Sequence, residues 1–91
     1  MFGNIRCSKS ISWQIEPDLD LVYIFNHRSS KWFYFEGVSK RIWESLVLDE
    51  NSFQQTVKKI SIEYETEYDV VFEDTEEFIK ELIDEDVVVN V

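Results

Sequence analysis

The spacing of apolar residues changes at Gly37, and this change limits the folds that the chain can adopt. Before Gly37, apolar and polar side chains alternate along short runs, which is typical of β-strands. After it, apolar residues recur every three or four positions, which is typical of amphipathic helices. The chain has only two glycines and one proline, too few for an all-β fold with many tight turns. The sequence therefore predicts one α+β domain over residues 1–91, with an ordered core from about residue 10 to residue 89.

Three strand-like runs precede Gly37: ISWQIE (11–16), LDLVYIFN (19–26) and KWFYFE (31–36). Pro17 and Asp18 separate the first two runs, and a polar turn at 27–30 separates the second from the third. Short connections of this kind predict a three-stranded antiparallel sheet.

Three helices are expected after the sheet. Ser39 can cap the first, whose inward residues are Val38, Ile42, Trp43 and Leu46. Ser52 and Gln55 form an S-x-x-Q capping box for the second, whose apolar stripe is Phe53, Val57, Ile60 and Tyr64. After a polar connection at 65–70, a third helix is expected over about 71–84, with Thr75, Phe78, Ile79, Leu82 and Ile83 inward. Residues 87–89 are expected to form a short, extended apolar tail, with a terminal strand as an option. The last two helices can form a helix-turn-helix with the sheet as its wing, so the predicted architecture is a winged helix-turn-helix.

The charge is distributed unevenly along the chain. Residues 1–48 hold five acids and six bases, whereas residues 49–91 hold fourteen acids and three bases. The acidic half would repel nucleic acid and anionic lipid and attract a basic partner, so neither DNA nor a membrane is an expected partner. No signal peptide or membrane span is evident. With Cys7 as the only cysteine, no internal disulfide can form; we expect a cytoplasmic protein, with Cys7 near a loose terminus.

No residue pattern indicates catalysis or metal binding. His27 is the only histidine, so no zinc site can be assembled from histidine and cysteine. Ser29 and Ser30 have no base near them in sequence, and neither a G-x-S-x-G motif nor a glycine-rich phosphate loop is present. The acids lack the spacing of a calcium loop. We therefore expect no enzyme activity, cofactor or metal.

The strand KWFYFE carries aromatic side chains on both faces. Phe33 and Phe35 are in phase with the helix that follows and are expected in the core. Trp32 and Tyr34 would then lie on the opposite face. A bare aromatic edge strand is an aggregation hazard, so a ligand is one explanation for it; simple coverage of the sheet is the other.

Three longer stretches resemble the PqqD-like family, also called RiPP recognition elements, whose members bind ribosomally made precursor peptides. WFYFEGVSKRIWESL is similar to the family's strand-to-helix junction, SFQQTVKKISIEYETEYDV to its second helix and DTEEFIKELIDEDVV to its third. Together the resemblance covers Ser12 to about Val89. Two positions differ: Phe35-Glu36 stands where the family often has Leu-Asn, and Asp86 where it often has Gly.

The resemblance implies a non-catalytic adaptor that binds the leader segment of the precursor and presents it to a modifying enzyme, such as a leader peptidase, a cyclase or a radical-SAM enzyme. The leader would add as a strand to the sheet, in a cleft beside the third helix. The implied peptide-binding residues are Lys31, Trp32, Phe33, Tyr34, Phe35, Glu36, Asp74, Glu77, Phe78, Glu81 and Leu82. The alternative is an acidic winged-helix module that binds another protein or, less readily, DNA.

Overall fold

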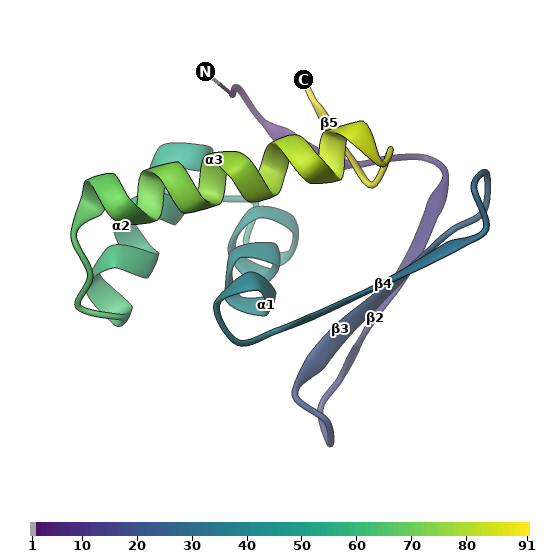
Figure 1. Ribbon diagram of the computed structural model, residues 1–91, viewed down its shortest axis with the longest axis horizontal. Coiled ribbons are helices and arrows are strands. Elements are labelled where there is room, and N and C mark those ends of the chain that lie inside the picture. Colours follow the sequence, from purple (N-terminus) through teal and green to yellow (C-terminus); the bar gives the residue numbers. More distant parts are fainter. Residues whose placement is uncertain (1) are drawn as a thin grey trace.

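Two antiparallel sheets and three helices make up the computed structural model, which describes residues 2–91 (Figure 1). The elements in chain order are β1 (Ile5–Cys7), β2 (Ile11–Glu16), β3 (Leu21–Asn26), β4 (Lys31–Glu36), α1 (Gly37–Trp43), the π-helical turn η1 (Glu44–Leu48), α2 (Phe53–Glu63), α3 (Tyr68–Asp84) and β5 (Val88–Asn90). The predicted α+β class, with three antiparallel strands followed by three helices, is confirmed.

The larger sheet has the strand order β2-β3-β4. Its outer two strands have the predicted bounds, whereas β3 begins at Leu21 rather than Leu19. Leu19 is exposed in the preceding turn, and Asp20 has φ 50°, a left-handed value that is incompatible with a strand. The alternating pattern of the sequence therefore specifies the strands, and the geometry of the preceding turn makes β3 start two residues later.

A second sheet joins the two ends of the chain and was not predicted. β1 pairs antiparallel with β5, with Cys7 opposite Val88, and Figure 1 shows the termini side by side. The expectation that Cys7 lies near a loose terminus is wrong: it lies in β1, half-buried, and burial raises the pKa of its thiol. Strand structure thus begins before residue 10, where the ordered core was expected to start. The assignment of residues 1–91 to a single domain stays a prediction.

The helix starts differ from two of the sequence predictions. α1 begins directly after β4 at Gly37, whose φ of 60° lets the chain turn sharply into the helix, and no side chain caps it. Ser39 lies inside α1, so its predicted capping role is wrong. α3 begins at Tyr68, within the predicted connection. The capping box of α2 is confirmed: Gln55 N donates to Ser52 Oγ at 3.1 Å, and Ser52 N donates to Gln55 Oε1 at 2.9 Å.

The core lies between the three-stranded sheet and the helices. It includes Val22 and Ile24 from β3 and is continued by residues of all three helices, Ile42, Trp43, Phe53, Val57, Ile60, Val71, Ile79 and Leu82. Val38 and Tyr64, which were predicted to face inward, are 42% and 44% exposed; Val38 lies in the first turn of α1 and Tyr64 directly follows α2. Both residues instead line a pocket among α1, α2 and α3.

Candidate leader-binding site

The exposed edge of β4 is the first component of the site. Within residues 2–91, β4 pairs only with β3, so the backbone groups along its other edge have no strand partner. Figure 1 shows α3 passing above α1, with its C-terminal end nearest the strands of the sheet. A groove of about 450 Å³ lies between β4 and this end of α3, lined by Lys31, Phe33, Glu81, Asp84 and Glu85. An unpaired strand edge beside a groove is the geometry that accepts a peptide as an added strand.

Contacts at both ends of the groove hold α3 beside β4. The rings of Phe35 and Phe78 meet edge to face, with centroids 5.0 Å apart. At the other end, Lys31 Nζ lies 3.0 Å from Glu85 Oε2. These contacts place the start of β4 next to the end of α3 and the end of β4 next to the middle of α3, so the two elements bound the groove.

The aromatic strand divides its side chains between two faces, as predicted. Phe33 and Phe35 are half-buried and pack against the core, on the side of α3. Trp32 and Tyr34 are 54% and 64% exposed, on the opposite face. There, Trp32 packs against Phe25 of β3 with ring centroids 4.8 Å apart. The structure therefore does not bring Trp32 and Tyr34 into the groove beside α3; it places them on the outer face of the same edge strand.

The predicted residues of α3 have unequal positions. Asp74, Glu77 and Glu81 are exposed, and Phe78 is half-buried against Phe35. Leu82, by contrast, is only 4% exposed and lies in the core. It supports α3 from inside the core and does not line the groove, which corrects its inclusion among the peptide-contacting side chains.

Two lining residues were missed from the sequence. Asp84 and Glu85 line the groove, although neither was among the predicted peptide-binding residues. Helical spacing was the sequence signal that could have identified Glu85. Glu81 follows Phe78 by three residues and Glu85 follows Glu81 by four, so the three side chains share one face of the helix. The groove is thus more acidic than predicted.

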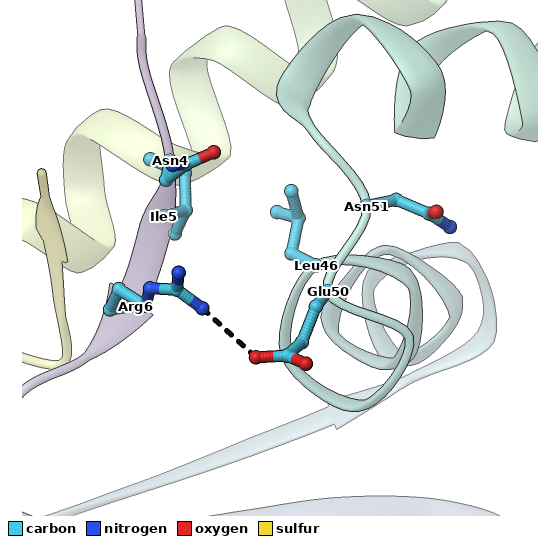
Figure 2. Close-up of a pocket in the computed structure, with 6 residues that line it drawn as sticks. All are labelled: Asn4, Ile5, Arg6, Leu46, Glu50 and Asn51. Atoms are coloured by element: carbon cyan, nitrogen blue, oxygen red, sulfur yellow. Dashed lines mark hydrogen bonds and ion pairs between the residues drawn. The ribbon is translucent and has the colours of Figure 1, made fainter.

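A separate pocket lies between β1 and η1 and contains no residue of β4 or α3. Figure 2 shows its lining, in which Arg6 and Glu50 form an ion pair of 3.0 Å across the opening. Its volume is about 150 Å³. Both partners are largely exposed, so the ion pair adds little to stability. We assign no ligand to it.

Neither a metal cluster nor a membrane helix is found in the part of the chain that the structure describes. Among residues 2–91, no three or more His, Cys, Asp or Glu side chains are grouped so that they could hold a metal ion. No helix in the same range is long and apolar enough to cross a bilayer.

The fold and the site together define an α+β domain that has an exposed edge strand beside an acidic helix. Residues 22–88 match the family model described as coenzyme PQQ synthesis protein D (PqqD), and the chain belongs to this family. The family resemblance identified in the sequence is therefore confirmed.

Two solved structures have the same fold. One is described as TbiB1 in complex with the TbiA(beta) leader peptide; it is 20% identical, with a TM-score of 0.83 over 91% of this chain and 93% of that one. The other is described as lasso peptide synthetase B1 complexed with the leader peptide; it is 19% identical, with a TM-score of 0.83 over 94% of this chain and 98% of that one. At these identities the likeness establishes the fold.

A curated relative matches a shorter stretch. It is the mitochondrial calcium uniporter protein of Neosartorya fischeri, 31% identical over 49 residues, which are 54% of this chain. The chain spans 10% of the length of that protein, so the match supports no inference about the activity of this chain.

Proposed function

We propose that this chain is a non-catalytic adaptor that binds the leader segment of a ribosomally made precursor peptide and presents it to a modifying enzyme. The observation that carries the proposal is the unpaired edge of β4 beside the groove of α3. The fold shared with TbiB1 and with lasso peptide synthetase B1, each solved in complex with a leader peptide, supports it. In this proposal α2 and α3 are the helix-turn-helix of a winged-helix domain, and the three-stranded sheet is its wing.

The two faces of β4 give a leader strand two sets of contacts. Backbone hydrogen bonds to the edge would set the register, and successive leader side chains would point to opposite faces. One set would enter the groove between Phe33 and Phe78. The other would pack on Trp32 and Tyr34. An edge strand with one aromatic face and one groove therefore fits a leader whose apolar residues lie on both sides.

The acids of the groove add a preference for basic leader residues. Glu81, Asp84 and Glu85 line the groove, and Lys31 is their one basic neighbour in the lining. Exposed charge pairs are each worth under about 1 kcal/mol, so they favour encounter and register more than affinity. The backbone edge and aromatic contacts would supply most of the binding energy.

The modifying enzyme would be a peptidase, a cyclase or a radical-SAM enzyme acting in the cytoplasm. The adaptor itself would contribute no reacting group. Its role would be to raise the effective concentration of the leader at that enzyme.

The test uses a synthetic leader from a short precursor peptide, which the proposal expects to be encoded beside the gene for this chain. Amide chemical shifts of the isotope-labelled protein are followed as the peptide is added. The proposal expects saturable shifts that cluster on residues 31–36 and 74–85. Saturable binding with shifts confined to β2 or α2 would place the site elsewhere, and an absence of binding would overturn the adaptor function.

A further inference from the structure

The helices of residues 2–91 lie on one side of the three-stranded sheet (Figure 1), where they share the core with Val22 and Ile24 of β3. The even-numbered residues of β2 and β4 and the odd-numbered residues of β3 point to the opposite side, which we call the outer face. The outer face is thus one side of a flat, regularly paired sheet whose three strands have six residues each.

Aromatic rings form one continuous cluster on the outer face. The ring centroid of Trp32 lies 4.8 Å from that of Phe25 and 6.1 Å from that of Tyr23. Trp32 also stacks on Tyr34, with centroids 6.4 Å apart. Trp32 and Tyr34 are both more than half exposed. Tryptophan and tyrosine contribute most at the centres of protein interfaces, so the cluster has the composition of a contact surface.

The sheet carries little net charge in a strongly acidic chain. Residues 9–36, which form the sheet and its turns, hold four acids and three bases, a net charge of −1. The whole chain carries −10, so the remaining residues carry −9. Two copies that met through their helices would repel each other, whereas contact through the outer faces keeps the acidic helices on opposite sides of the dimer. The charge distribution therefore directs contact between copies to the outer face.

The acids of the outer face lie in one row at one end of the sheet. Glu16 pairs with Leu21, and Leu21 pairs with Glu36 on its other side. The row at the opposite end consists of uncharged residues, namely Ser12, Phe25 and Trp32. Two sheets packed with antiparallel strands place each acidic row over the uncharged row of the other copy, whereas parallel packing would stack the two acidic rows. The outer face is therefore complementary to itself in the antiparallel direction.

The available area fits a reversible dimer. Large aromatic side chains bury roughly 150–250 Å² each, so the exposed parts of the cluster and its rim offer on the order of 500 Å² per copy. The two copies together would bury about 1,000 Å², which is at the low end of specific interfaces. Association in the micromolar range is therefore expected rather than a permanent dimer.

We propose that the outer face binds a second copy of this chain, in a two-fold dimer whose sheets pack face to face with antiparallel strands. Sheets in such sandwiches lie about 10 Å apart. The two-fold axis crosses the strands at the middle row of the outer face, which consists of Gln14, Tyr23 and Tyr34.

This dimer goes beyond the proposed function and does not rest on it. The groove between β4 and α3 lies on the helix side of the sheet, so each copy keeps it open. A leader added to β4 would extend each sheet by one strand in the same layer, with its outward side chains beside Trp32 and Tyr34.

Sedimentation equilibrium without any leader tests the proposal. Wild-type protein should form a reversible dimer at concentrations below about 1 mM. Gln14 is exposed and lies in the middle row, so it approaches Gln14 of the second copy. Gln14→Glu and Gln14→Lys should each weaken the dimer by about tenfold or more, because like charges then face each other across the interface. Gln54→Glu, at an exposed position of α2, is the matched control and should leave the dimer unchanged.

An equimolar mixture of Gln14→Glu and Gln14→Lys should regain association, because opposite charges then meet at the two-fold axis. Recovery in the mixture would also show that both variants are folded. Three results would each overturn the proposal: wild-type protein that stays monomeric up to about 1 mM, a dimer that neither Gln14 variant weakens, or a mixture that fails to associate. None of them concerns leader binding, so the adaptor function would stand.

Discussion

The side-chain amide of Asn26 donates a hydrogen bond of 3.1 Å to the backbone carbonyl of Glu85, which joins the end of β3 to the end of α3. Asn26 Nδ2 also lies 3.2 Å from the carbonyl oxygen of Asp86. Its Oδ1 accepts from the backbone N–H groups of Arg28 and Ser29. Asn26 is 1% exposed, so these bonds satisfy a polar group that is otherwise costly to bury. Because Glu85 lines the groove, Asn26 sets the distance between α3 and the hairpin that carries β4.

Replacing Asn26 by aspartate should destabilise the fold and loosen the groove. A carboxylate cannot donate to the carbonyls of Glu85 and Asp86, and it would bring a buried charge against them. We expect the free energy of unfolding to fall by about 1–3 kcal/mol, measured by urea denaturation, and leader affinity to fall with it. Asn4→Asp makes the same charge change at an exposed position and should leave both quantities unchanged. Equal losses in the two variants would show that added negative charge, not the lost bonds, is responsible.

Leader binding should depend more on the aromatic face than on the acids. Tyr34→Ala removes an aromatic anchor and should cost about 2 kcal/mol of binding energy, whereas Glu77→Gln removes one exposed charge and should cost under about 1 kcal/mol. Only the contribution of Glu77 should fade at high salt. Leader titrations of both variants at low and high ionic strength measure this difference. A larger loss for Glu77→Gln, or a salt-dependent loss for Tyr34→Ala, would indicate that charge rather than burial drives recognition.

Acid should weaken the contact between α1 and α2. Arg41 donates from Nε to Glu63 Oε2 at 2.9 Å and from a terminal nitrogen to Glu63 Oε1 at 2.8 Å, and this bidentate bond lowers the pKa of Glu63 below its ordinary value of about 4.5. A lowered pKa in the folded state means that the stabilisation is complete above pH 4.5 and disappears as the pH falls through the lower value. Since Glu63 is partly exposed, the effect should be under about 1 kcal/mol.

The measurement is urea denaturation of wild-type protein and Glu63→Gln at pH 7 and at about pH 3. The two proteins should differ at pH 7 and converge in acid, because protonated glutamate resembles glutamine. Glu67→Gln, at the start of α3, is the control for a change in net charge. A difference between wild type and Glu63→Gln that persists unchanged in acid would exclude the linkage.

Placing glycine at one position in the turn between α2 and α3 should increase the stability of the fold. Glu65 has φ 51°, and the bonds from Thr66 N to Ser61 O and from Glu65 N to Ile62 O form a Schellman motif around it. Left-handed backbone is unfavourable for residues with a Cβ atom, so Glu65→Gly should raise the free energy of unfolding by about 1 kcal/mol. Glu65→Ala removes the same charge without relieving the backbone. A gain of equal size in the alanine variant would attribute the effect to charge.

Asp86 stands where the family often has glycine, and its backbone adopts the left-handed conformation that glycine favours. It follows α3 with φ 57°, and the bonds from Val87 N to Leu82 O and from Asp86 N to Ile83 O complete a second Schellman motif. Glycine is the usual residue there. The carboxylate gives this aspartate its own contacts, since Asp86 Oδ1 accepts from Ser8 Oγ at 3.1 Å and Arg28 lies 3.4 Å from Oδ2. The departure from the family therefore changes the side-chain contacts of the helix exit and keeps its backbone.

The sequence by itself determined the three-stranded sheet, the three helices and the two faces of the aromatic strand. Apolar spacing specifies β2, β4 and the three helices, and Ser52 with Gln55 specifies the start of α2, because these signals act between residues close in the chain. The division of Phe33 and Phe35 from Trp32 and Tyr34 follows from strand geometry alone.

Only the tertiary structure decided which distant residues meet. β1 was missed because Ile5–Cys7 is too short to show a period, and its partner β5 lies at the far end of the chain. The groove likewise depends on the position of α3, which Asn26 and the Phe35–Phe78 contact hold beside β4. Leu82 and Glu85 show the consequence: both are near the end of one helix, yet packing buries the first in the core and leaves the second to line the groove.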